Sequence, residues 1–413
     1  MKFSIALVAV LALVAASQSR ETGLRSFNGY QVFTVEVTTH GQLELLRSLY
    51  LGGDYDFWTT PRGLGFTDVM AAPQQVAAFT SIMDKAGIKF TVKVPDVETL
   101  VREERVANQK AGSERISWDR YPRFAEIETW LNGLSSQYAT VSVIGRSYNG
   151  LAIHAVKFST GGAPKKSVII DANIHAREWI AGATATWIIN ELITNTAAYM
   201  NVLNEIDIHV IPMVNPDGYE FCHTGDRLWR KTRSVTSGSA CLGCDPNRNF
   251  AFMFGGESTS PNPCSDIYHG SAAFSESETT AVRDYIVAQE AAGARFLAYL
   301  TFHCYGNVWL LPWGYTAGVY PPDYDQQLSL GRAAIAALQA VHNTRYQTGQ
   351  GADLLYGVGG ASDDWAKNHG IKYTTTVEMR GNSFVLPPAQ IIPNAQEVWA
   401  AVQVYFQRVI ETP

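Results

Sequence analysis

Three short apolar segments, far apart in the sequence, each lead to a side chain that can bind a metal ion or move a proton. The segments and the side chains that follow them are 167–172 with His175 and Glu178, 296–302 with His303, and 372–377 with Glu378. Apolar runs of this length predict buried strands. Open α/β sheets bind ligands outside the carboxyl ends of their strands, so we expect these side chains to meet at one edge of a sheet.

The histidines and the first glutamate form a ligand set that is typical of zinc. His175 and Glu178 are three residues apart, and His303 supplies a second imidazole from a distant segment. Three protein ligands leave the fourth tetrahedral position open to water, which distinguishes a catalytic zinc from a structural one. The alternative is that His175 and Glu178 are an ordinary pair of surface residues and that His303 is a strand histidine without a metal. The position of these residues at predicted strand ends favours the zinc site.

The region from about residue 118 to the end alternates between β-rich and helical segments. Such alternation predicts an α/β fold with a mixed, mostly parallel sheet covered by helices on both faces. The chain has 413 residues and 46% hydrophobic content, which is enough for a large core. The helices that we expect lie near 123–134, 178–194, 275–291, 325–342 and 394–409.

A smaller unit precedes this region. Strands are predicted at 30–37, 57–61 and 88–94, with helices at 41–51 and 74–86. This order fits a small α+β open sandwich, an antiparallel sheet with helices on one face. Residues 97–115 are polar and helix-prone, and they predict a solvated helical linker. The linker offers cleavage sites for a trypsin-type protease at a domain boundary, namely Arg102, Arg105, Lys110 and Arg115.

The first residues predict export. Lys2, an apolar stretch at 3–14 and small residues at 15–17 make a secretory signal peptide over residues 1–17. No later stretch is long and apolar enough to cross a bilayer, so we expect a secreted, extracellular, soluble protein without a membrane partner. The net charge is −6 and basic clusters are absent from the sequence, which argues against nucleic acid as a partner. The expected units are therefore 1–17, 18–115 and 116–413.

Five cysteines in an exported chain predict disulfides and one odd thiol. The C-x-x-C spacing at 241–244 also occurs in redox pairs and in halves of zinc ribbons. The sequence has no second C-x-x-C, so separate structural bridges are favoured.

The order of His175, Glu178, His303 and Glu378 resembles that of the zinc metallocarboxypeptidases of the pancreatic A/B type. Further motifs fall in register with that family: NPDGY at 215–219, WRKTR at 229–233, DPNRN at 245–249, Tyr356, and FVLP at 384–387. The likeness covers nearly everything from about residue 118 onward. Residues 20–115 look like the family's inhibitory activation segment, so the chain looks like a procarboxypeptidase zymogen.

The resemblance implies a role for each matching residue. His175, Glu178 and His303 would hold one Zn²⁺ per chain, with Asp245 orienting the first histidine. Glu378 matches the general base and Arg233 the residue that stabilises the oxyanion. Arg248 matches the residue that binds the free carboxylate of the substrate, a task that suits a two-pronged guanidinium. Asn247 and Tyr356 match the residues that make additional contacts to this carboxylate in the family. Three residues match contacts further along the peptide, with simple packing as the alternative: Arg177, Tyr305 and Phe384.

Specificity within the family depends on the floor of the pocket. Counted from Tyr356, Asp363 falls on the floor position, where A-type enzymes carry an apolar residue and B-type enzymes an aspartate. The resemblance therefore implies release of C-terminal Lys or Arg, with Gly314 and Gly351 leaving the pocket roomy. The alternative for Asp363 is a solvated loop position, with Asp364 as the structural residue. Two other functions stay open: an A-type enzyme, and an inactive carboxypeptidase-like binding protein.

The family also implies partners and a disulfide. The partners are peptide or protein C-termini, an activating trypsin-like protease and protein inhibitors, and a monomer is the default state. Cys241 and Cys264 match the family's shared disulfide. Cys222 and Cys244 have no counterpart there, and we expect them to pair with each other. Cys304 stands where the family usually has serine, and it is left as the free thiol.

Overall fold

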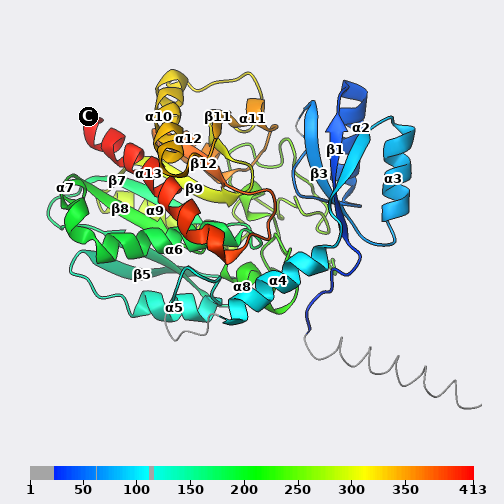
Figure 1. Cartoon of the computed structure of the whole chain (residues 1–413). Helices are drawn as coiled ribbons and strands as arrows, with labels where there is room; N and C mark the ends of the chain where they lie inside the picture. Colours follow the sequence, from blue (N-terminus) through cyan, green and yellow to red (C-terminus); the bar gives the residue numbers. More distant parts are fainter. Residues whose placement is uncertain (1–22, 62, 111–115) are drawn as a thin grey trace, which may run out of the picture.

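The computed structural model describes residues 23–61, 63–110 and 116–413. The predicted signal peptide and Arg115 lie outside these residues. Figure 1 shows a small sheet with helices on one side and a larger sheet with helices on both sides, connected by helix α4 (Val97–Lys110). Within the described ranges, no helix combines the length and the apolar character that a membrane span requires.

The small part is an antiparallel sheet with the strand order β2-β3-β1-β4. Its elements are β1 (Gln31–Val37), α2 (His40–Gly52), β2 (Asp56–Phe57), β3 (Gly65–Ala71), α3 (Val76–Lys85) and β4 (Lys89–Val94). Alternate β1 residues share one face of a sheet, and Phe33 and Val35 pack there with Leu46 of α2 and Phe79 of α3. The predicted α+β open sandwich is confirmed.

Strand β3 is missing from the sequence prediction. Asp68 interrupts the apolar pattern of this segment, yet only 7% of it is exposed. The Thr34 hydroxyl donates to Asp68 Oδ1 over 2.6 Å, and Lys93 forms an ion pair with Oδ2. A charged residue can occupy a strand interior when neighbouring strands supply its partners, and those partners cannot be identified from the local sequence.

Within the part of the chain that the structure describes, the large sheet has eight strands in the order β11-β10-β12-β9-β7-β8-β6-β5. The strands are β5 (Ala139–Arg146), β6 (Ala152–Phe158), β7 (Lys166–Ala172), β8 (Ile206–Ile211), β9 (Arg295–Cys304), β10 (Val308–Leu311), β11 (Gln347–Gln350) and β12 (Tyr373–Met379). The central strands β12, β9, β7 and β8 run parallel, whereas β6 and β5 are antiparallel at one edge. The predicted mixed, mostly parallel sheet is confirmed.

Helices cover both faces of this sheet (Figure 1). One face packs against α6 (Trp179–Thr194), α10 (Tyr324–His342) and α13 (Ile391–Glu411), and the other against α9 (Ser277–Ala291) and α12 (Ser362–His369). The remaining α-helices are α5 (Phe124–Asn132), α7 (Met200–Glu205), α8 (Pro216–Thr224) and α11 (Gly351–Leu354). On β9, Leu300 and Phe302 belong to the first core and Tyr299 to the second. Both faces of β9 are therefore buried, which accounts for the apolar run from Phe296 to Leu300.

The parallel register brings the chemical groups to one edge of the sheet. Glu378 on β12 lies opposite His303 on β9. His175 follows the end of β7 by three residues, and Glu178 is the N-cap residue of α6. Segments separated by up to about two hundred residues thus deliver their polar ends to the same place, as the strand-end pattern predicts.

Candidate active site

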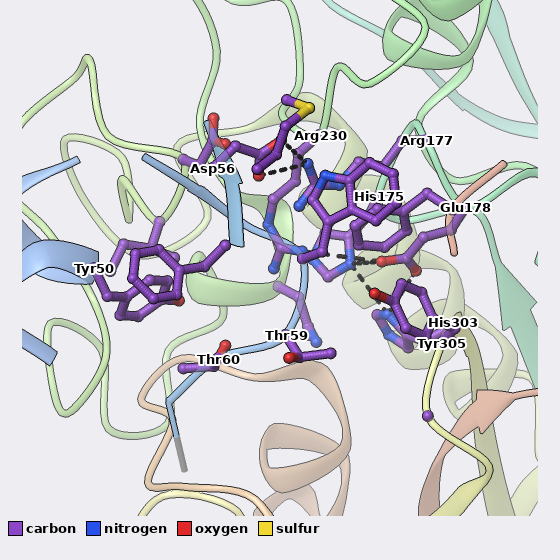
Figure 2. A pocket seen from close by; sticks show the side chains of 18 of the residues that line it. Tyr50, Asp56, Thr59, Thr60, His175, Arg177, Glu178, Arg230, His303 and Tyr305 are labelled. Atoms are coloured by element: carbon purple, nitrogen blue, oxygen red, sulfur yellow. Dashed lines mark hydrogen bonds and ion pairs between the residues drawn. The ribbon is translucent and has the colours of Figure 1, made fainter. Parts of the chain in front are cut away.

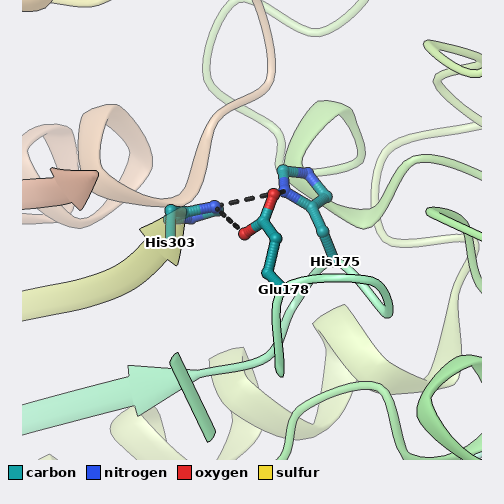
Figure 3. Close-up of side chains that lie close together, drawn as sticks. All are labelled: His175, Glu178 and His303. Carbon is teal, nitrogen blue, oxygen red and sulfur yellow. Dashed lines mark hydrogen bonds and ion pairs between the residues drawn. The ribbon is translucent and has the colours of Figure 1, made fainter. Parts of the chain in front are cut away.

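His175, Glu178 and His303 form a compact cluster, and the ligand atoms of these described residues lie within 4.8 Å of one another. His175 Nδ1 lies 2.8 Å from Glu178 Oε1, and His303 Nδ1 lies 3.1 Å from Glu178 Oε2 and from His175 Nδ1 (Figure 3). All are at most 4% exposed. Two imidazole lone pairs at this separation repel each other unless a proton or a cation lies between them. The donor set and its geometry fit zinc.

Asp245 fixes the orientation of His175. Its Oδ1 lies 3.1 Å from His175 Nε2, which leaves Nδ1 with its lone pair directed at the cluster. Burial alone would raise the pKa of the Asp245 carboxyl, but Arg230, Arg248 and His175 hold it well below its usual range. Arg230 donates to Asp245 Oδ2 through Nη2 at 2.8 Å. An ionised carboxylate therefore supports the imidazole.

The candidate ligands line a cavity of about 450 Å³ that also includes Glu378. Glu378 is half-buried near the end of β12, beside His303 in the register. A carboxylate in this position, next to a metal site and partly removed from water, has the surroundings of a general base.

Groups suited to bind an anion lie along the same cavity. Asn247 and Arg248 belong to the short 3₁₀ turn Pro246–Arg248, and Tyr356 follows α11. Arg248 donates to the Ser258 carbonyl through Nε and to the Asn247 carbonyl through Nη1, each over 2.9 Å. These bonds hold the guanidinium in one orientation, so less side-chain entropy is lost when it binds a carboxylate.

Asp363 lies in the first turn of α12 and also lines the cavity, with Gly314 and Gly351. It is 5% exposed, so it is not a solvated loop residue. Burial raises the pKa of the Asp363 carboxyl, and a hydrogen bond from Thr376 counteracts this. Asp364 has a different contact, since its Oδ1 accepts the Gly314 N–H over 2.8 Å.

Comparison with known proteins follows the same division of the chain. The zinc carboxypeptidase family matches residues 127–401, and the carboxypeptidase activation peptide matches residues 33–104. The chain belongs to the zinc carboxypeptidase family. It is a metallocarboxypeptidase that carries an activation peptide, as zymogens do.

Relatives of both specificity types match this zinc carboxypeptidase. Carboxypeptidase B of Astacus astacus is 44% identical over 305 residues, which cover 72% of this chain and 99% of that protein. Carboxypeptidase A1 of Sus scrofa is 34% identical over 406 residues, which cover 94% of this chain and 95% of that protein. The crystal structure of thrombin activatable fibrinolysis inhibitor superimposes with a TM-score of 0.84 at 29% identity, covering 94% of this chain and all of that one.

The activation segment of this carboxypeptidase reaches into the cavity. Figure 2 shows Tyr50, Asp56, Thr59 and Thr60 on the same cavity as the candidate metal ligands. The residues expected to contact the peptide further from its end are brought together here, and each contacts the segment. Arg177 Nη1 lies 3.0 Å from Asp56 Oδ1, the Tyr305 hydroxyl donates to Asp68 over 3.1 Å, and the Phe384 ring lies 5.7 Å from that of Trp58.

The structure does not bring Arg233 to the site, and its assignment as the oxyanion residue is corrected. Its guanidinium lies over the rings of Phe221 and Trp229, at 3.6 and 4.5 Å from their centroids. Of the described residues that line the cavity, Arg230 supplies the cation from this segment. Its Nη1 lies 3.9 Å from Glu178 Oε1. Both arginines belong to the motif at 229–233, and the local sequence does not indicate which of them faces the cavity.

The cysteines differ from the expectation at one pair. Cys241 and Cys264 are joined, as the resemblance implies. The predicted pairing of Cys222 with Cys244 is wrong, since both are free and buried in the described structure, as is Cys304. Cys222 Sγ donates to the Trp229 carbonyl and Cys244 Sγ to the Asp245 carbonyl, each over 3.3 Å. The two thiols thus have separate backbone acceptors.

Proposed function

We propose that this protein is a secreted zinc exopeptidase, made as a zymogen, that removes Lys or Arg from the C-terminal end of peptides. The observation that carries the proposal is Asp363, a buried carboxylate on the wall of the cavity that holds the candidate metal ligands. A carboxylate removed from water is costly unless a cation pairs with it. The cavity therefore favours a substrate side chain that ends in a positive charge. The predicted signal peptide supports secretion.

The chemistry follows from the groups around the cavity. His175, Glu178 and His303 would hold the zinc, which supplies a Lewis acid for the scissile carbonyl and makes water more acidic. Glu378 accepts the proton of the attacking water and passes it to the departing amine. Arg230 donates hydrogen bonds to the carbonyl oxygen as negative charge develops on it.

Recognition of a free carboxylate restricts cleavage to the last residue. Arg248 binds that carboxylate through two parallel N–H donors, with Asn247 and Tyr356 as further contacts. A peptide bond inside a chain lacks this anion, so it gains none of the binding energy. The substrate side chain then extends towards Asp363, and Gly314 and Gly351 leave room for a long Lys or Arg.

The activation segment accounts for latency. It contacts Arg177, Tyr305 and Phe384, which would otherwise meet the preceding residues of the substrate or of a protein inhibitor. Cleavage by a trypsin-like protease in the linker, within the expected 18–115 segment, would release it from the 116–413 domain. Of the basic residues in the expected linker, Arg102 and Arg105 lie within helix α4, which must open locally before a protease can cleave there.

Trypsin activation followed by assays on blocked dipeptides tests this proposal. The activated chain should hydrolyse substrates ending in Arg or Lys with a kcat/KM on the order of 100-fold above those ending in Phe or Leu. Asp363→Asn should abolish most of this preference, because the buried cation loses its partner. Asp364→Asn is the matched control, and it should keep the preference because Asp364 does not line the cavity.

Three outcomes contradict parts of the proposal. Preference for Phe by the wild type would favour A-type specificity. Turnover of no substrate by a folded, zinc-loaded, cleaved chain would support the inactive binding protein. An Asp363→Asn variant that keeps the wild-type preference would refute the role of this residue.

A further inference from the structure

A buried polar layer lies directly beneath the candidate metal ligands. On β9, Tyr299, Thr301 and His303 are alternate residues and therefore point to the same face of the sheet. Asp171 on β7 lies opposite Thr301 in the parallel register. Asp171, Tyr299 and Thr301 are each 0% exposed. Polar groups at this depth are stable only when they bond to one another, so their contacts identify what they support.

These contacts form a chain that ends at the metal cluster. Thr301 Oγ1 lies 3.2 Å from His303 Nε2, and the Tyr299 hydroxyl donates to Asp171 Oδ2. Burial raises the pKa of the Asp171 carboxyl, and hydrogen bonds from Thr301 and Tyr299 counteract this. Asp171 Oδ1 is buried and has no partner in good hydrogen-bond geometry within residues 23–61, 63–110 and 116–413, Thr301 included. The Thr301 hydroxyl thus contacts the imidazole, and Asp171, its register neighbour on β7, has a carboxylate oxygen free to accept a hydrogen bond.

The direction of the hydrogen bonds follows from the cluster. His303 Nδ1 faces Glu178 and His175, so this nitrogen must present its lone pair when a metal is bound, and the proton must reside on Nε2. Thr301 Oγ1 can accept a hydrogen bond from His303 Nε2–H only if the Thr301 O–H group points away from the imidazole. A hydroxyl both accepts and donates, and the carboxylate that lies opposite Thr301 in the sheet register is that of Asp171.

We propose that Asp171 acts through Thr301 as the positioning residue for His303, holding the imidazole in the tautomer and orientation that bind the metal. This inference rests on the proposed zinc site. His175 has a carboxylate partner in direct contact, Asp245, whereas the partner of His303 is the Thr301 hydroxyl, which in the proposed path donates to Asp171. Each imidazole then has a hydrogen-bond partner on the ring nitrogen that does not face the metal site. The orientation of both ligands therefore does not depend on whether substrate or the activation segment occupies the cavity.

Zinc affinity of the full-length chain tests the proposal without relying on activity. Thr301→Val removes the hydroxyl at nearly constant volume and should weaken zinc binding roughly 10-fold, measured by competition with a chromophoric chelator. Asp171→Asn should weaken it similarly. Thr301→Ser keeps the hydroxyl and should bind zinc as the wild type does. The matched control is Thr374→Val, which removes a buried hydroxyl that lacks a hydrogen-bond partner among the described residues.

A double-mutant cycle and a spectroscopic probe sharpen the test. Thr301→Val and Asp171→Asn act on one path, so the double variant should bind zinc no more weakly than the worse single variant. The visible spectrum of the cobalt-substituted chain should change in Thr301→Val and stay unchanged in Thr374→Val. Additive losses, or a Thr301→Val chain with wild-type zinc affinity and cobalt spectrum, would overturn the proposal. Altered substrate preference with unchanged zinc affinity in these variants would also overturn it, and a wild-type chain without zinc affinity would overturn the proposed function as well.

Discussion

Two arginines of the same short motif, Arg230 and Arg233, have opposite surroundings. Arg230 pairs with Asp245 and lines the cavity, whereas Arg233 stacks on the Phe221 and Trp229 rings. This segment is neither helix nor strand and it bends at Lys231, so no regular periodicity decides which arginine faces the site. The residues that pack against the segment decide which of the two arginines faces the cavity. At the scale of the residue, position in a motif is therefore weaker evidence than the contact that the side chain makes.

Substitution of each arginine by glutamine separates the two roles. Arg230→Gln should lower kcat of the activated enzyme by roughly 100-fold or more, because a charged donor near the reacting carbonyl is lost. Arg233→Gln, the matched control, should keep kcat within about two-fold of the wild type, because only ring packing is lost. Steady-state kinetics on a blocked Arg-ended dipeptide measure both. A large loss of kcat in Arg233→Gln with none in Arg230→Gln would restore the prediction made from the motif.

At the scale of the element, the first turn of α9 carries a carboxyl group with unusual acidity. Glu278 is 0% exposed, and burial, with Glu276 and Asp217 adding repulsion, raises the pKa of its carboxyl to about 7. In the unfolded chain this pKa is the ordinary 4.5. The folded state therefore binds the proton more tightly than the unfolded state does. The stabilising contribution of this group is complete below pH 4.5 and is lost as the pH rises through 7.

This linkage predicts a pH-dependent difference between the wild type and Glu278→Gln. At pH 8 the variant should be the more stable chain, by up to the order of 3 kcal/mol, because it does not bury a charge. Near pH 5 the two should have similar unfolding midpoints. Thermal or urea unfolding across this range measures the difference. A constant gap at all pH values would show that the effect comes from packing instead.

At the scale of the whole molecule, one buried ion pair joins the activation segment to the catalytic region. Glu104 on α4 accepts from Arg227, with Nη2 to Oε1 at 2.9 Å, and both side chains are at most 4% exposed. Arg227 also donates to the Arg177 and Phe384 carbonyls, over 3.0 and 2.9 Å. The pair thus connects the linker helix to backbone beside the cavity. Its partners are 123 residues apart in the sequence.

Removal of this carboxylate should loosen the zymogen. Glu104→Gln leaves a buried guanidinium without its anion, which typically costs about 3–5 kcal/mol. We expect a lower unfolding midpoint and roughly 10-fold higher hydrolysis of small substrates by the uncleaved chain. Glu103→Gln changes the exposed neighbour on the same helix and should alter neither. Equal behaviour of the two variants would mean that the ion pair does not hold the segment in place.

The sequence alone determined the fold class and the candidate metal ligands because these depend on local patterns. Apolar runs followed by His175, His303 and Glu378 identified strands and their ends, and parallel strands with buried ends must bring such groups to one edge. The tertiary structure decided what depends on distances between segments. It chose Arg230 over Arg233, kept Cys222 and Cys244 apart, and set Asp56 against Arg177. Periodicity along the chain records which residues are buried, whereas the identity of their neighbours is fixed only when distant segments pack together.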